Sequence, residues 1–293
     1  MLQLRSFILL IRIHQWTKNF FIFLPAFFAF KIVDQNIVYD LILTFFGFSF
    51  LASAIYVFND MLDIESDKLH PTKKNRPLAS GVISKNTGII LIICLLIASF
   101  AILSILGNSI VIGIASIYLV QNILYTVKLK HIALVDIMLI ATGFVLRIYI
   151  GGEASNTQLS HWIILMTLVL ALFLALAKRR DDVFNYLQTG QKARKNLNGY
   201  NMEFLNVAIT IMSTIVIVCY VMYCTSPEVT ARLGDHVYLT SFFVILGVLR
   251  YLQLTFVWYI TGSPTTVLLK NAFLQIILIG WIISFFLIIY LKF

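Results

Sequence analysis

Three aspartates at helical spacing are the residues of this sequence that most clearly could do chemistry. Asp60, Asp63 and Asp67 follow Asn59 in the pattern N-D-x-x-D-x-x-x-D, in a chain with only 13 acidic residues. Steps of three and four residues place the three carboxylates on one face of a continuous helix. Because like charges at this spacing repel each other, the pattern indicates either a bound divalent cation or a solvated helix end.

A bound cation explains the aspartates better than solvation does, and Mg²⁺ is the cation that we predict. Mg²⁺ is held by a few carboxylates together with waters and phosphate oxygens, and seldom by an all-protein cage. We therefore predict that Asn59, Asp60, Asp63 and Asp67 bind the metal, and that the three aspartates are the catalytic residues.

A basic segment with two prolines follows the aspartates directly. Its cations are Lys68, Lys73, Lys74, Arg76 and Lys85. The prolines limit its helical content. A metal that bridges phosphate oxygens beside Lys and Arg side chains forms a receptor for a pyrophosphate. We expect Lys73 and Arg76 to bind substrate in this way.

A second group of candidate substrate-binding residues comprises Tyr125, Lys128, Lys130, Asp136 and Arg147. Tyr125 could equally be an interfacial anchor, and the two lysines could simply mark the cytoplasmic side. Asp136 could pair with Lys130 or with a substrate hydroxyl. Arg147 lies about 16 Å further along the helix and needs an interior partner, either a lipid phosphate or a buried acid or carbonyls.

The remaining candidates flank these two groups. Lys18 and Asn19 lie near the N-terminus and could face the site, and the run from Lys178 to Asp182 places cations and acids at the membrane level of the aspartates. We predict that Lys178 and Arg179 also bind substrate. The alternatives for these cations are a purely topological role and a solvated helix face.

The amino-acid composition indicates what kind of protein must position these residues. Of the 293 residues, 60% are hydrophobic and 12% are charged, and the mean hydropathy is +0.93. A soluble domain is about half apolar and a quarter charged. These values exclude a soluble globular enzyme, a disordered chain and a DNA-binding module. The three cysteines are too few and too scattered for a disulfide framework or a zinc site.

Hydropathy predicts nine membrane helices, since each needs about 20 mainly apolar residues. The predicted spans are 17–33, 38–58, 89–106, 109–126, 132–150, 161–177, 204–224, 236–257 and 271–291. Gly151 and Gly152 are expected to end the fifth helix. No long hydrophilic stretch is present at either end, so we predict an all-α membrane protein with a single transmembrane domain over residues 1–293.

The distribution of Lys and Arg predicts the orientation of these spans. With the N-terminus in the cytoplasm, 17 of the 22 basic residues lie on the cytoplasmic side. The exceptions are Lys31, Arg232 and Lys292 on the opposite side, and Arg147 and Arg250 within spans. Topology thus accounts for most of the net charge of +9, and we expect no nucleic-acid partner. We predict a multi-pass protein of the cell (inner) membrane whose N-terminus and active site face the cytoplasm.

These residues resemble the UbiA-type superfamily of intramembrane transferases over nearly the whole chain. The segment from Asn59 to Asp67 is similar to the first aspartate-rich, Mg²⁺-binding motif of that superfamily. The resemblance implies nine transmembrane helices around a central cavity, with a polar cap on the cytoplasmic side. Within the superfamily, the chain most resembles the decaprenyl-phosphate phosphoribosyltransferase branch. The segments that carry this likeness are 15–19, 59–81, 125–130, Arg147 with Gly151 and Gly152, and 178–180.

The later acidic residues separate the branches of the superfamily. Its prenyltransferases usually carry a second D-x-x-x-D motif in a later cytoplasmic loop. The acids after position 136 are Glu153, Asp181, Asp182, Glu203, Glu228 and Asp235. None of them makes that spacing, which favours the phosphoribosyl branch. Two departures from the family pattern are Ile13, where proline is usual, and the segment from Gly262 to Asn271, which lacks the acids expected there.

The resemblance implies Mg²⁺-dependent transfer of a 5-phosphoribosyl group from phosphoribosyl pyrophosphate to a polyprenyl (decaprenyl-type) phosphate in the bilayer, with release of pyrophosphate. The alternative is transfer of a prenyl group from a prenyl pyrophosphate to an aromatic or other polar acceptor. A transporter ranks third, because it would predict charged pairs near the midplane and repeat symmetry. Here the acids gather at one interface and no repeat is visible.

Overall fold

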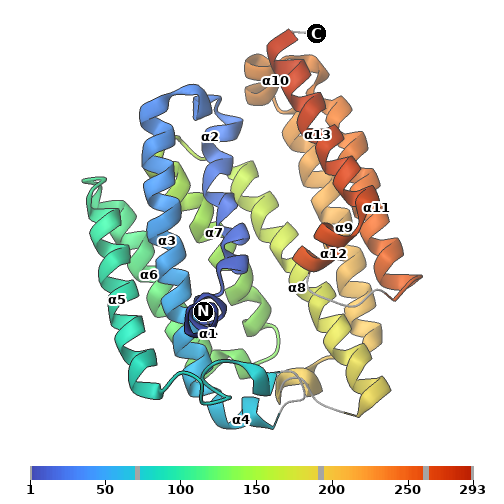
Figure 1. Ribbon diagram of the computed structural model, residues 1–293. Helices are drawn as coiled ribbons and strands as arrows, with labels where there is room; N and C mark the ends of the chain where they lie inside the picture. Colours follow the sequence, from blue (N-terminus) through green and yellow to red (C-terminus); the bar gives the residue numbers. More distant parts are fainter. Residues whose placement is uncertain (1, 70–72, 191–194, 260–263, 292–293) are drawn as a thin grey trace. The chain divides into compact units, whose positions relative to one another are not determined.

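The computed structural model of the chain describes residues 2–69, 73–190, 195–259 and 264–291, and these residues form helices and connections without a strand (Figure 1). The longer helices are α3 (Gln35–Leu62), α5 (Lys85–Ser104), α6 (Ser109–Val127), α7 (Val135–Ala154), α8 (His161–Thr189), α9 (Met202–Thr225), α11 (Ser241–Phe256) and α13 (Ala272–Leu291). The shorter α-helices are α1 (Leu2–Ile11), α2 (Leu24–Phe28), α4 (Ile64–Lys68), α10 (Pro227–Leu233) and α12 (Pro264–Lys270). The 3₁₀ helices are η1 (Ile13–Phe23), η2 (Lys31–Val33), η3 (Lys73–Asn75), η4 (Leu129–His131), η5 (Lys195–Gly199) and η6 (Asp235–Thr240).

Seven helical segments are long and apolar enough to cross a membrane, judged by length and composition in the part of the chain that the structure describes. They are α3, α5, α6, α7, α8, α9 and the continuous segment of η6 and α11. The apolar stretch of α13, Ala272–Ile288, is shorter. The predicted class of an all-α membrane protein is therefore confirmed, whereas the count of nine membrane helices and the cytoplasmic cap stay predictions.

The prediction of one regular helix over residues 17–33 is wrong. The chain runs through η1, the five-residue α2 and η2 in place of one regular helix. Pro25 lies in the first turn of α2, where its missing N–H is tolerated, so an α-helix begins there and does not pass through it. Phe30, in the left-handed region at φ 59°, breaks the chain direction again before η2.

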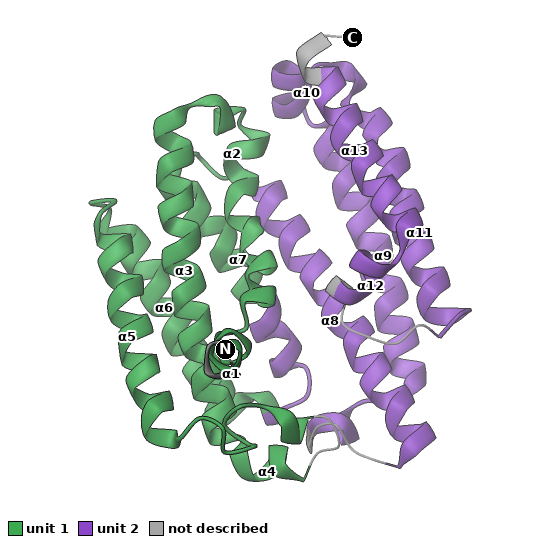
Figure 2. Cartoon of the chain, viewed as in Figure 1, with its two compact units in different colours: residues 1–130, 142–160 green, residues 131–141, 161–293 purple. Residues whose placement is uncertain are grey.

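The described helices form two compact units (Figure 2). Unit 1 comprises residues 1–130 and 142–160, and unit 2 comprises residues 131–141 and 161–293. Helix α7 supplies its first residues to unit 2 and the rest to unit 1. Each unit is described by itself below, and the single transmembrane domain over the whole chain stays a prediction.

Unit 1 is built around α3, which packs along α5, α6, η1 and α1. The core beside α3 contains Phe48, Leu51 and Ile150. Gly151 lets η1 come close to α7, because a Cβ at this position would lie 2.0 Å from the carbonyl oxygen of Ile22. The expectation that Gly151 and Gly152 end the helix is wrong, since α7 continues to Ala154 and uses the glycine for close packing instead.

Unit 2 consists mainly of α8 packed against α9, with α11 packed against α9 and α13. Its core contains Phe173, Leu205 and Ile209. Arg180 joins three helices of this unit, because it donates to Asn206 on α9 at 2.8 Å and to the Thr255 carbonyl on α11 at 2.8 Å. A buried cation thereby finds neutral acceptors in an apolar bundle.

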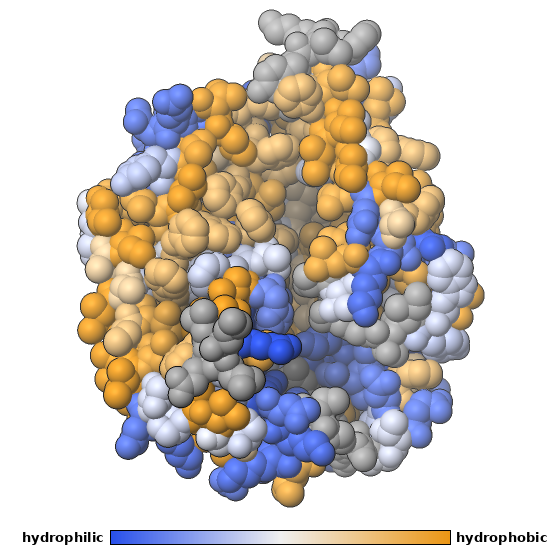
Figure 3. All heavy atoms as spheres, viewed as in Figure 1, coloured by the Kyte–Doolittle hydropathy of each residue, from blue (hydrophilic) through white to orange (hydrophobic). Residues whose placement is uncertain are grey.

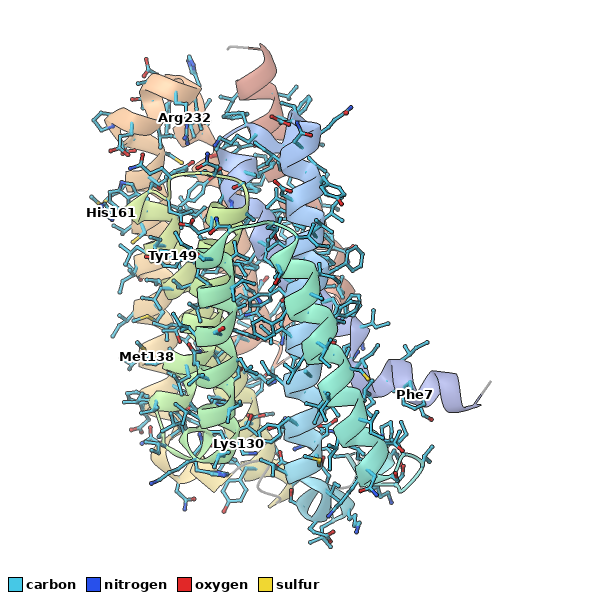
Figure 4. All side chains as sticks on the ribbon, turned by 90° about the vertical axis from the view of Figure 1, so that its left-hand side faces the viewer. Phe7, Lys130, Met138, Tyr149, His161 and Arg232 are labelled. Carbon is cyan, nitrogen blue, oxygen red and sulfur yellow. The ribbon has the colours of Figure 1, made fainter. Side chains whose placement is uncertain are left out.

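The surface of unit 1 has an apolar part and a polar end. Figure 3 shows apolar residues along its helices and hydrophilic residues gathered around α4. Exposed isoleucines such as Ile90 and Ile97 on α5 and Ile117 on α6 match a helix surface that faces lipid. Helix α1, which carries Phe7, runs sideways away from the axis of α3 (Figure 4). The polar end of unit 1 contains the aspartates.

Candidate active site

The aspartate motif lies where α3 turns into α4. Helix α3 ends at Leu62, and Asp63 is its C-cap, with its backbone N–H donating to the Asn59 carbonyl at 3.0 Å. Helix α4 begins at Ile64. The expectation of one continuous helical face is therefore wrong, because the backbone turns at Asp63 and gives the Asp63 carboxylate a different partner from those of Asp60 and Asp67.

Asp60 and Asp67 converge on one guanidinium. Nη1 of Arg76 lies 2.9 Å from Oδ1 of Asp60 and 2.6 Å from Oδ2 of Asp67. Both aspartates are only 3% exposed. Arg76 follows η3 directly, and its backbone N–H donates to the Lys73 carbonyl at 2.9 Å. The basic segment predicted to bind phosphate thus folds back over the aspartates.

Arg12 is a second cation on Asp60, and no motif in the sequence marks it as a site residue. Nη2 of Arg12 donates to Oδ1 of Asp60, and the guanidinium lies 5.0 Å from the centre of the Tyr56 ring. Arg12 joins α1 to η1 in a left-handed conformation, at φ 53° and ψ 50°. Positive-inside topology alone explains an arginine here, so its position carries no signal beyond charge.

Asp63 belongs to a separate ion pair. Nζ of Lys130 lies 2.8 Å from Oδ1 and 3.0 Å from Oδ2 of Asp63, and the Asn59 amide donates to the same carboxylate at 3.2 Å. Figure 4 shows Lys130 at the end of unit 1 that carries α4. The structure therefore brings Lys130 to the aspartate motif through Asp63, while its predicted role in substrate binding stays a prediction.

Two of the three carboxylates are placed where they could share a metal ion. Among the described residues, no three His, Cys, Asp or Glu side chains are arranged to hold a metal. Asp60 and Asp67, however, each direct one oxygen at a single nitrogen of Arg76. Two carboxylates that share one cationic atom can also share Mg²⁺, which commonly uses one or two carboxylates and takes its other ligands from phosphate and water.

Arg147 lies in the interior of unit 1 and is 5% exposed. Its Nε donates to Oδ1 of Asn19 at 2.8 Å, its Nη1 to the Gly143 carbonyl at 2.6 Å, and its Nη2 to the Tyr118 hydroxyl at 2.9 Å. The amide of Asn19 in turn donates to the Ser49 hydroxyl on α3 at 2.9 Å. The structure brings the predicted residues Asn19 and Arg147 together, with neutral oxygens as the acceptors of Arg147.

Asp136 and Arg179 form a buried network in unit 2, and both are 0% exposed. Nε of Arg179 donates to Oδ2 of Asp136 at 2.7 Å, and the hydroxyl of Tyr200 donates to Oδ1 at 2.7 Å. The Tyr200 oxygen also accepts the backbone N–H of Leu134 at 2.8 Å. Burial raises the pKa of Tyr200 to about 12, so the phenol stays a donor. The ion-pair partner of Asp136 among the described residues is thus Arg179, whereas Lys130 pairs with Asp63.

The other predicted substrate-binding residues are Lys73, Tyr125, Lys128 and Lys178. Tyr125 is in the last turn of α6, and Lys128 caps that helix with an exposed side chain. Lys73 begins η3, and Lys178 precedes Arg179 on α8. Lys73, Tyr125 and Lys128 therefore share unit 1 with the aspartates, whereas Lys178 belongs to unit 2.

Comparison with known proteins places these features in a family context. A model of the UbiA prenyltransferase family matches residues 20–190. The chain is 32% identical to the decaprenyl-phosphate phosphoribosyltransferase of Mycolicibacterium smegmatis, over 93% of this chain and 88% of that protein. It is 28% identical to the protein of the same name in Corynebacterium glutamicum, over 96% of this chain and 86% of that protein.

The fold is also similar to a solved structure. The structure of a UbiA homolog from Archaeoglobus fulgidus bound to DMAPP and Mg²⁺ covers 97% of this chain and 99% of its own, with a TM-score of 0.72 and 19% sequence identity. At this identity the likeness concerns the fold.

Proposed function

The chain belongs to the UbiA prenyltransferase family and is a membrane transferase, and on this premise we propose that it moves a 5-phosphoribosyl group from phosphoribosyl pyrophosphate to a polyprenyl phosphate. The observation that carries the proposal is the similarity over 93% of the chain to a decaprenyl-phosphate phosphoribosyltransferase. The missing second D-x-x-x-D motif supports it.

The donor pyrophosphate would bind at the end of unit 1 that carries Asp60 and Asp67. These two carboxylates, assisted by Asn59 and Asp63, would hold Mg²⁺, which when bound neutralises charge on the leaving pyrophosphate. The Mg²⁺ in the Archaeoglobus fulgidus homolog supports this choice of ion. Arg76 already lies against both carboxylates, so its guanidinium is positioned to bind a phosphate oxygen beside them.

The reaction that follows is a single substitution at the anomeric carbon. A phosphate oxygen of the acceptor forms a bond to C1 of the ribose while the bond from C1 to pyrophosphate breaks, and the electron pair leaves with pyrophosphate. Lys73, Lys128 and Lys130 would stabilise the negative charge that grows on the leaving group. The acceptor phosphate is largely ionised near neutral pH, with its second pKa near 6, so no strong general base is required.

Asp136 and Arg179 have a less direct part in this proposal. Each is completely buried and bound to the other, so neither side chain offers a free polar group to a substrate. Through Tyr200 they hold the segment before α9 against the start of α7. They would act by positioning this polar segment of unit 2.

The orientation of the protein is part of the same proposal. The aspartates, Arg12, Arg76 and Lys130 all belong to segments that positive-inside topology assigns to the cytoplasm. A soluble phosphorylated sugar donor would reach them from that side. We therefore place the N-terminus and the active site on the cytoplasmic face of the inner membrane.

A transfer assay on purified protein in detergent tests the proposal. The protein receives Mg²⁺, a polyprenyl phosphate and phosphoribosyl pyrophosphate labelled in the ribose. The variant pair Asp60→Asn and Asp67→Asn is compared with Glu65→Gln, an exposed acid of the same motif that pairs only with Lys68 among the described residues. We expect label in the lipid phase with the wild type and Glu65→Gln, and at least a hundredfold less with the aspartate variants.

The same assay separates the alternative reaction. A protein that leaves the phosphoribosyl label in water but transfers a prenyl group from a prenyl pyrophosphate to an acceptor would be a prenyltransferase with the same aspartate site. The family description and the DMAPP-bound homolog are the observations that favour this second candidate.

A further inference from the structure

Unit 1 contains a buried cation for which the described residues supply no counter-charge. All three donor groups of Arg147 bind neutral oxygens, those of Asn19, Gly143 and Tyr118. The rings of Phe48, Tyr118 and Phe144 surround its guanidinium, with centres 5.0–5.2 Å from Cζ. Ring faces offset part of a positive charge, but they do not replace an anion for a charge held away from water.

Lys18 adds a second positive charge beside Arg147. It precedes Asn19 on η1, the residue that accepts from Arg147 Nε. The charges of Arg147 and Arg12 both act on the Lys18 ammonium. Among the described residues, Lys18 has no hydrogen-bond acceptor and no ion-pair partner. The aspartate motif offers none, because Arg12 and Arg76 already bind the carboxylates of Asp60 and Asp67. Two neighbouring cations without a carboxylate form a site for an anion.

The contacts of η1 along α3 show that this place is distinct from the aspartate site. Arg12 contacts Asp60, Trp16 donates to the Ser53 hydroxyl, and Asn19 pairs with Ser49. Ser49 lies about 16 Å from Asp60 along α3, at 1.5 Å per residue. A pyrophosphate held at Asp60 and Asp67 would therefore lie at a different level of α3 from Arg147 and would leave this cation without an adjacent anion.

We propose that Lys18 and Arg147 form a second anion site that binds a phosphate monoester, on the interior side of the pyrophosphate site. The inference rests on the proposed function for the source of the phosphate. Two groups of that reaction have this chemistry, the lipid phosphate of the acceptor and the 5-phosphate of the ribose donor. Asn19 fixes the Arg147 guanidinium through Nε, and Lys18 supplies the ammonium that is still unpaired.

Ligand-induced stabilisation in EDTA tests the site without the metal. The melting temperature of the detergent-solubilised full chain is measured with farnesyl phosphate or ribose 5-phosphate, and with farnesol or ribose as uncharged controls. A ligand that binds only the folded state raises Tm, and the shift grows with the logarithm of the ratio of its concentration to its Kd. We expect one of the two phosphates to stabilise the wild type and its uncharged control to have no effect. The effective phosphate identifies the source as lipid or donor.

Variants connect the binding to the proposed residues. Lys18→Met should require at least tenfold more phosphate for the same shift, and Lys18→Arg should restore most of the affinity. Lys270→Met, which removes an exposed lysine at the end of α12, is the matched control and should bind like the wild type. Lys18 is partly exposed, so its loss is compatible with folding, whereas Arg147→Lys serves as the second variant because it keeps a buried cation.

The outcomes distinguish this inference from the proposed function. The anion site is wrong if neither phosphate stabilises the wild type, or if Lys18→Met and Arg147→Lys bind as well as the wild type. Phosphate binding that depends on Lys18, together with no transfer of phosphoribosyl label, would leave the anion site standing and overturn the proposed donor. Transfer of the phosphoribosyl label, together with phosphate binding that does not depend on Lys18, would support the proposed function and overturn the anion site.

Discussion

Arg12 and Asp60 are 48 residues apart in the chain, yet the guanidinium of Arg12 binds the buried carboxylate of Asp60. Asp60 therefore has two cations, because Arg76 binds the same oxygen at 2.9 Å. Asp67 has Arg76 as its ion-pair partner. The two arginines are consequently unequal, since the loss of Arg76 affects both buried carboxylates and the loss of Arg12 affects one.

Arg76→Met is expected to destabilise the protein more than Arg12→Met does. Removing one partner of a buried ion pair typically costs about 3–5 kcal/mol, and partial exposure of Arg76 reduces this to about 2–4 kcal/mol. For Arg12→Met we expect about 1–2 kcal/mol. Unfolding in detergent with EDTA measures both losses. Mg²⁺ should recover part of the Arg76 loss by binding between Asp60 and Asp67, and an equal loss with and without Mg²⁺ would contradict their role as metal ligands.

The ion pair between Asp63 and Lys130 should appear as coupling between two substitutions. Asp63→Asn and Lys130→Met are each expected to cost about 1 kcal/mol of stability, because the pair is partly exposed. The double variant should lose no more than the larger single loss, since the second change removes an interaction that is already gone. Additive losses in the double-mutant cycle would show that the two side chains do not interact.

Tyr200→Phe is expected to destabilise the protein by about 1–3 kcal/mol, because Asp136 loses a donor and the Leu134 N–H loses its acceptor in a buried place. The wild type should also lose stability as pH rises from about 10 to 12. In that window the unfolded phenol ionises, while the folded one, with its pKa raised to about 12, stays protonated. The difference in stability between the wild type and Tyr200→Phe should shrink there, and a constant difference would contradict the buried neutral phenol.

Gly151→Ala is expected to be among the most damaging small substitutions in the chain. A Cβ at this position would lie 2.0 Å from the Ile22 carbonyl oxygen, so η1 would have to move away from α7. We expect a loss of about 3 kcal/mol or more, as for an overpacked core. Gly113→Ala on α6 is the control, because its Cβ meets nothing within 4 Å, and it should gain up to about 1 kcal/mol from helix propensity. Equal melting temperatures for the two variants would contradict the close contact.

The sequence predicts local features of this protein well. The class of the fold follows from composition and hydropathy, and the aspartate motif with its basic segment follows from spacing and residue type. The structure places Arg76 against Asp60 and Asp67, which are close to it in sequence as well as in space, although their roles toward metal and phosphate stay predictions. For residues so close in sequence, residue type and spacing are enough to predict that they lie together.

Features that depend on distant contacts could not be predicted. The turn at Asp63 splits the carboxylates, although the acidic spacing fits a continuous helix. Asp136 and Arg179 are 43 residues apart and pair with each other, and no local pattern indicates such a pair. Arg12 contacts Asp60 across 48 residues, and its charge is indistinguishable from that of a topological arginine. The turn at Asp63 and both ion pairs depend on tertiary packing, which the local sequence of each segment does not reveal.

The ion pairs at the end of α3 also determine how the site handles incoming charge. Arg12, Arg76 and Lys130 balance Asp60, Asp63 and Asp67, so these six side chains together are electrically neutral. A lone divalent cation or a lone pyrophosphate would each disturb that neutrality by adding charge of one sign. In a magnesium–pyrophosphate complex the metal offsets part of the phosphate charge, so the complex would disturb the balance less than a lone pyrophosphate. Metal and donor are therefore expected to enter as one complex, with little saturation by either alone.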